Sequence, residues 1–138
     1  MNRVLKLLAI AVLAYVVFLV LRPAKSPGEV AAESWLAVVD SGGYSQSWDQ
    51  ASEYFKSRVT RDDWVADLRR DHQPLGRARS RRVKSAQYIA CPSGITLGHC
   101  MRIRYQASYE NLPSAIENVG VVKEDGQWRV AGYFLNTE

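Results

Sequence analysis

The stretch that decides the fold runs from Met101 to Leu135 and reads MRIRYQASYENLPSAIENVGVVKEDGQWRVAGYFL. Apolar and polar side chains alternate along its first part, with Met101, Ile103, Tyr105, Ala107 and Tyr109 on one side and Arg102, Arg104, Gln106 and Ser108 on the other. A period of two predicts a half-buried β-strand whose apolar side faces a core. The segment from Asn111 to Ser114 then interrupts the alternation.

Further strands are expected on both sides of this one. A third strand is predicted over residues 115–123 and a last one over residues 128–135, with the hairpin signal Asp125-Gly126 between them. Upstream, the pattern also has a period of two after Gly76, which predicts a first strand from about residue 79 to residue 90. The chain therefore predicts a four-stranded antiparallel meander.

About three helices are expected before the sheet. Ser26-Pro27-Gly28-Glu29 has the residues of a capping box, and one face then carries Ala31, Ala32, Trp35, Leu36 and Val39 before Gly42-Gly43 ends the helix. A second helix is expected to carry Trp48, Ala51 and Phe55. A third begins at Thr60 with acids in its first turn and ends before Pro74. Helices followed by a meander indicate an α+β class, with the helices packed on one face of the sheet.

The N-terminus has the composition of a membrane helix. An apolar run from Leu7 to Leu21 follows Arg3 and Lys6. Counted from Val4, the segment is about 27 Å long at ~1.5 Å per residue, close to the roughly 30 Å of a bilayer core. Tyr15 lies near the middle of the run, where its hydroxyl has no water. We therefore expect Tyr15 to contact a neighbouring membrane helix.

A cleaved secretory signal is the alternative interpretation of this segment. Ala24-Lys25-Ser26 supplies the small residues of a cleavage site, but Pro27 would follow the cut and Arg22-Pro23 interrupts the approach. We favour a retained anchor. The predicted organisation is a membrane anchor and linker over residues 1–25 and an exported domain over residues 26–138, located in the periplasm of a bacterium and held at its inner membrane.

The two cysteines, Cys91 and Cys100, enclose a short loop. In an oxidising compartment such a pair is most simply a disulfide. A metal site made of these cysteines and His99 has an unusual spacing and lacks a nearby fourth ligand. We therefore predict a disulfide and no metal.

The isoelectric point of the whole chain is basic, about 9.2, but the exported domain taken alone is expected to be nearly neutral. Arg3, Lys6 and Arg22 belong to the anchor, so the other 15 of the 18 Lys and Arg residues nearly balance the 14 acids. The basic residues concentrate between Arg69 and Lys84. On two adjacent strands they are expected to form an exposed cationic stripe, which comprises Arg79, Arg81, Arg82, Lys84, Arg102 and Arg104.

This stripe is the candidate binding site. Nucleic acid is excluded as a partner by the predicted compartment. An acidic protein or anionic lipid headgroups fit the charge, since a tethered domain lies within reach of the membrane surface. The alternative interpretation is that the stripe is an ordinary solvated surface that binds no partner.

Several blocks of the sequence resemble a known family. They are Ala32-Glu33-Ser34-Trp35-Leu36, Ser47-Trp48, Trp64-Val65, Pro74-Leu75-Gly76, Ser80-Arg81-Arg82 and the closing run from Gly126 to Phe134. Over residues 31–135 the chain is similar to the bacterial domain-of-unknown-function family 4019. That family has no assigned activity, so the resemblance implies an envelope location and a shape. The order of elements also resembles the cystatin-like or nuclear-transport-factor-like cone, a fold that hosts enzymes, ligand binders and interaction modules.

Some cones of that kind use tyrosine, aspartate and histidine side chains for proton transfer in a pocket between helices and sheet. The corresponding candidates here are Tyr54, Tyr88, Tyr105, Tyr109, Asp49 and His72. Tyr105 and Tyr109 are expected to be ordinary core tyrosines, because no motif places an acid or histidine beside them. His72 is expected to be a cation that complements the C-terminus of its helix.

The sequence therefore predicts a membrane-anchored accessory or interaction domain without a cofactor, such as a small subunit of an inner-membrane complex, rather than an enzyme. The nearest alternative is a small-ligand-binding cone, which would need a pocket of about 300 Å³ or more with Tyr105 or Tyr109 at its wall. An enzyme of the proton-transfer type comes third.

Overall fold

The computed structural model describes residues 2–96 and 98–137. The elements follow one another as α1 Arg3–Val20, α2 Pro27–Asp40, α3 Tyr44–Gln50, α4 Glu53–Lys56, α5 Arg61–His72, the short 3-10 helix η1 Gln73–Leu75, β1 Ala78–Ile89, β2 Cys100–Tyr109, β3 Leu112–Glu124 and β4 Gln127–Thr137. The α+β class is confirmed: the helices come first, and one four-stranded sheet follows.

The four strands pair antiparallel in the order β1-β2-β3-β4, which confirms the predicted meander. The sheet is longer than predicted at its β2–β3 turn. The chain turns at Glu110 and Asn111, so a break is present, but it is shorter than the predicted one from Asn111 to Ser114, because Leu112 already pairs with Tyr109. The ladder accommodates Pro113, which has no amide hydrogen, at an irregularity between Ala107 and Tyr109.

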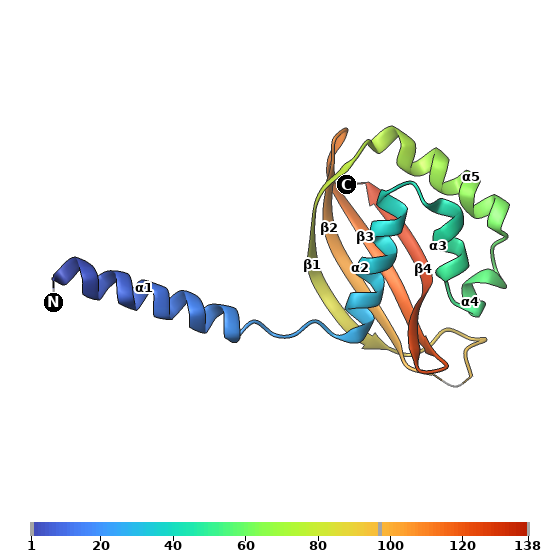
Figure 1. The fold of residues 1–138 in the computed structure, drawn as a ribbon. Coiled ribbons are helices and arrows are strands. Elements are labelled where there is room, and N and C mark those ends of the chain that lie inside the picture. The colour runs from blue at the N-terminus through green and yellow to red at the C-terminus, as the bar shows by residue number, and fades with distance from the viewer. Residues whose placement is uncertain (1, 97, 138) are drawn as a thin grey trace.

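Helices α2, α3 and α5 lie on one side of the sheet, and the opposite side is left open (Figure 1). Helix α2 lies directly against the sheet, and its capping box at Ser26 and Glu29 is formed as predicted. The single helix expected around Trp48 is two helices. Between them Ala51 is extended, and the amide of Ser52 donates to the carbonyl of Val130 on β4 at 2.8 Å.

The core lies between α2, α3, α5 and the sheet. Its largest rings belong to Trp35 and Trp64, which are both buried. Their indole nitrogens donate to Ser47, Trp35 to the carbonyl at 2.8 Å and Trp64 to the hydroxyl at 2.9 Å. Trp48 and Trp128 are only half-buried. Two of the four tryptophans are therefore enclosed in the core, and the other two pack against its edge.

Helix α1 stands apart from the rest of the chain, joined to α2 by residues 21–26 (Figure 1). By length and composition it is able to cross a membrane, and it is equally able to serve as a signal sequence. Tyr15 and every other residue of α1 are exposed. The expected contact between Tyr15 and another membrane helix stays a prediction.

Cys91 and Cys100 form the predicted disulfide, with a sulfur–sulfur distance of 2.08 Å. It ties the end of β1 to the start of β2 and closes the loop between them. A disulfide of this kind is typical of a protein from an oxidising compartment.

Replacing both cysteines with alanine should lower the free energy of unfolding by about 2–3 kcal/mol, because the unfolded chain regains the freedom that the short cross-linked loop removes. Chemical denaturation of the intact chain in detergent would measure the loss. Reducing agent should produce the same loss in the wild type and no change in the C91A/C100A variant. Equal stability of oxidised and reduced wild type would contradict a stabilising role.

Candidate functional site

A completely buried carboxylate lies at the centre of the sheet's helix-covered side. It belongs to Glu117 on β3, whose side chain is 0% exposed. Arg81 donates to it from Nε at 2.5 Å and from Nη2 at 3.1 Å. The hydroxyls of Tyr109 and Tyr133 donate to its Oε1 at 2.5 Å and 2.8 Å. Oε1 thus accepts three hydrogen bonds and Oε2 accepts one.

Two further residues extend this arrangement to the helices. Arg81 also donates to Asp40 at the end of α2, with Nη1 to Oδ2 at 2.7 Å and Nη2 to Oδ1 at 3.1 Å. His72 at the end of α5 has its Nε2 3.0 Å from the hydroxyl of Tyr133. We call these six residues the Glu117 cluster: Asp40, His72, Arg81, Tyr109, Glu117 and Tyr133.

The charges inside the Glu117 cluster follow from its contacts. Burial raises the pKa of Glu117, but the hydrogen bonds and charge of Arg81, together with the two tyrosine hydroxyls, outweigh burial and lower it. Burial and the charge of Glu117 raise the pKa of Tyr109 and of Tyr133. At neutral pH the cluster therefore holds a carboxylate, a guanidinium and two protonated phenols.

His72 differs from its predicted role as a cation at a helix end. Its ring is buried and packs against the rings of Tyr109 and Tyr133, with centroids 6.1 Å and 5.6 Å apart. Burial lowers its pKa, so the imidazole is neutral at neutral pH. Because Tyr133 donates its hydroxyl proton to Glu117, the proton of His72 belongs on Nε2, which donates to Tyr133.

Tyr109 was wrongly expected to lack an acid or histidine neighbour, since it contacts both Glu117 and His72. The sequence interpretation missed Glu117. A signal was present, because Glu117 alternates with the apolar residues Ala115, Val119 and Val121 and so places a charge in the middle of an apolar side of β3.

The other candidates for proton transfer do not join this cluster. Asp49 pairs with Arg61 on the surface, the ring of Tyr54 lies under Arg58, and Tyr88 is exposed beside Trp128. The buried hydroxyl of Tyr105 makes no hydrogen bond within the described residues. Each carboxylate oxygen of the Glu117 cluster already accepts a hydrogen bond from within the cluster, which supports a structural role for it.

The predicted cationic stripe needs a correction at Arg81. Its side chain is only 16% exposed and points to the covered side of the sheet, where Glu117 and Asp40 hold it. The residues next to each other in a strand face opposite sides, so Arg82 points the other way. The inclusion of Arg81 in an exposed stripe was wrong.

The remaining members of the stripe are exposed. Arg102 pairs with Gln87, Arg104 with Ser85, and Arg82 with Gln106, which places all three arginines on the open side of the sheet. We call Arg82, Arg102 and Arg104 the open-face arginines. The ladder skips Arg79 and Lys84, which lie at two irregularities of β1. Whether any of them binds a partner stays a prediction.

The open-face arginines have no partner of their own. Within residues 2–96 and 98–137, none of their side chains makes an ion pair or a hydrogen bond. The strand positions around them on this side of the sheet are uncharged: Ser80, Ser85, Gln87, Gln106, Ser108, Ile116, Asn118, Gly120, Gly132, Phe134 and Asn136. Glu124, at the end of β3 on the same side, is held by the amide of Glu53 and lies 4.0 Å from Arg129. Positive charge without a neighbouring acid is complementary to an anionic partner.

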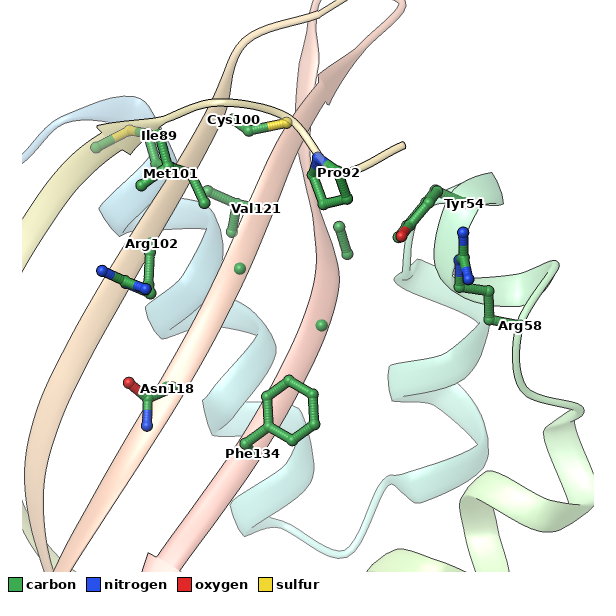
Figure 2. A pocket seen from close by; sticks show the side chains of 13 residues that line it. Tyr54, Arg58, Ile89, Pro92, Cys100, Met101, Arg102, Asn118, Val121 and Phe134 are labelled. Carbon is green, nitrogen blue, oxygen red and sulfur yellow. The ribbon is translucent and has the colours of Figure 1, made fainter. Parts of the chain in front are cut away.

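A cavity of about 310 Å³ opens next to these arginines. Strands β2, β3 and β4 form its floor, and α4 and the disulfide loop face it (Figure 2). Its lining is mostly apolar and comprises Tyr54, Arg58, Ile89, Pro92, Cys100, Met101, Arg102, Asn118, Gly120, Val121, Ala131, Gly132 and Phe134. Neither Tyr105 nor Tyr109 lines it. The cavity therefore has the volume that the ligand-binding alternative requires but not the tyrosine wall, and that alternative stays a prediction.

The chain matches one family model, which is described as "Protein of unknown function (DUF4019)", over residues 31–133. This match confirms the resemblance inferred from the tryptophan blocks and the closing run. None of the curated proteins matches the chain. The likeness to a cystatin-like or nuclear-transport-factor-like cone stays a prediction.

Replacing Glu117 with glutamine should destabilise the fold by roughly 3–5 kcal/mol, because it leaves the buried guanidinium of Arg81 without one of its two counter-charges. Chemical denaturation of the intact chain would measure this loss. The matched control is E110Q, which breaks the surface pair of Glu110 and Arg77 and should cost less than about 1 kcal/mol. A loss in E117Q no larger than in E110Q would refute the structural role.

His72 should make stability depend on pH. Since folding lowers its pKa from the usual 6.5, the unfolded chain binds a proton that the folded chain excludes. The stability is complete above about pH 6.5 and falls as the pH decreases through that value. The variant H72Q keeps a donor near Tyr133 but does not titrate there. Its unfolding midpoint in urea should change less than that of the wild type between pH 7.5 and 5.5, whereas equal changes would count against this assignment.

Proposed function

The chain belongs to the DUF4019 family of proteins of unknown function, and we propose that it is a membrane-anchored interaction domain whose open sheet face binds an acidic partner protein. The partner would be a component of the bacterial inner membrane or periplasm, and this chain would be an accessory subunit of its assembly. The observation that carries the proposal is the group of three unpaired arginines on the open face, Arg82, Arg102 and Arg104, whose neighbouring strand positions are uncharged.

The location of the domain is supported by two independent features. Helix α1 has the length and composition to cross a membrane, and the disulfide between Cys91 and Cys100 fits an oxidising compartment. Residues 21–26 separate the helix from the domain. At no more than ~3.6 Å per residue this linker keeps the domain within about 20 Å of the membrane surface.

The inner side of the sheet is a poorer candidate for binding the partner than the open face. Its arginine, Arg81, already bridges two carboxylates, and the polar groups of the Glu117 cluster bond to one another. The open-face arginines, in contrast, keep all their donors available. Guanidinium groups bind carboxylates through two parallel hydrogen bonds, which favours an acidic protein surface.

The double charge reversal R82E/R104E should abolish co-purification of the partner when the intact protein is isolated from membranes in mild detergent. Wild-type association should weaken as salt is raised, because exposed charges are screened. The matched control is R69E/K123E, which changes the net charge equally at exposed residues away from the open face and should retain the partner. Unchanged association and salt dependence in R82E/R104E would show that the arginines only aid solubility.

A further inference from the structure

Two glycines face each other in the middle of the open sheet face. Gly120 on β3 pairs directly with Gly132 on β4. Neither has a positive φ, so their backbone conformation does not demand glycine. A Cβ atom would meet nothing closer than 3.8 Å at Gly120 and 4.0 Å at Gly132. Both positions therefore have room for a side chain. Neither the backbone conformation nor a lack of space explains the two glycines, although glycine weakens a strand.

The missing side chains leave the floor of the cavity bare. Figure 2 shows the ring of Phe134 on one side of this floor, with Tyr54 on α4 and Arg58 in the turn after α4 facing it and Pro92 above. Phe134 is 70% exposed, which is unusual for a large apolar side chain in a sheet. An apolar side wall and a bare floor together form a recess for an apolar group.

The walls of this recess are held in place without a ligand. Arg58 donates from Nη2 to the carbonyl of Ser93 at 3.2 Å and lies 4.4 Å from the centre of the Tyr54 ring. The disulfide at Cys91 anchors the same loop. A recess that is already formed loses little entropy when it is filled, which favours binding.

The rim of the recess carries positive charge. Arg58 and Arg102 are its two charged lining residues, and no carboxylate lines it. Arg102 is also one of the open-face arginines, and Arg104 follows two residues later on the same strand, about 7 Å away at ~3.4 Å per residue. An extended peptide presents alternate side chains at the same spacing. The recess and the arginines thus match one linear, acidic segment.

We propose that the recess at Gly120 and Gly132 receives one aromatic or aliphatic side chain from an extended acidic segment of the partner protein. This inference rests on the proposed function and adds to it the point at which the partner is anchored. The acids flanking the apolar side chain pair with Arg58 and the open-face arginines. A buried apolar anchor ringed by charge contacts is the usual arrangement of a binding hot spot.

The test uses the full chain in nanodiscs of zwitterionic lipid and three fluorescent peptides. One is acidic with a central phenylalanine, the second has serine in place of phenylalanine, and the third has amides in place of its acids. Fluorescence anisotropy should show the acidic phenylalanine peptide binding at least about tenfold more tightly than either of the others. Equal affinities would overturn the inference.

The variant G132V tests the contribution of the recess independently of the charges, because it leaves all the arginines unchanged. Valine suits a strand, so the variant should be at least as stable as the wild type while its side chain fills the recess. The phenylalanine peptide should then bind no better than the serine peptide. The matched control is N136V, which places the same side chain on the same strand and face outside the recess and should keep the preference for phenylalanine.

The remaining outcomes distinguish this inference from the proposed function. If G132V binds the phenylalanine peptide as the wild type does while R82E/R104E binds neither acidic peptide, the recess is not the anchor but the open face still binds acids. If R82E/R104E binds all peptides normally, the proposed function fails. If the wild type binds vesicles of phosphatidylglycerol but no peptide, the open face docks on the membrane and both proposals are wrong.

Discussion

The buried carboxylate of Glu117 is the constraint on which the rest of the domain depends. A charge without water or partners costs several kcal/mol in a protein interior, so the fold must deliver donors to it. The donors come from three other strands, Arg81 on β1, Tyr109 on β2 and Tyr133 on β4. A shift of any strand by one residue would turn its donor to the opposite face and leave the charge unpaired. The cluster therefore specifies the register of the whole sheet.

The same constraint divides the domain into a structural side and an available side. Asp40 and His72 connect the cluster to the ends of α2 and α5, which fixes two helices over the inner face. On the inner face the polar groups of the Glu117 cluster are consequently bonded to one another, and the apolar groups around them are packed. The open face keeps unpaired arginines and an unfilled recess at Gly120 and Gly132. Features that the fold does not use for its own stability are the ones available for binding.

The local features of this fold could be predicted from the sequence, whereas the long-range ones could not. Alternation along residues 101–109 and the Asp125-Gly126 turn are local signals, and they predicted the meander correctly. Arg81 and Arg82 have the same charge, so the sequence does not indicate which of them faces inward. The partner that decides it, Glu117, lies 36 residues further along the chain. The recess is equally non-local, because Gly120 and Gly132 matter only as a pair across two strands.

A short tether also explains why a weak site on the open face would suffice. Residues 21–26 would hold the domain near the membrane, and a partner in the same membrane would then meet it at a high effective concentration. Exposed arginines contribute little affinity each, since water and salt screen them. They do favour a negatively charged partner, and they raise the rate of association with it. The recess would add the apolar contact that charges alone do not provide, so that orientation and retention depend on different parts of one surface.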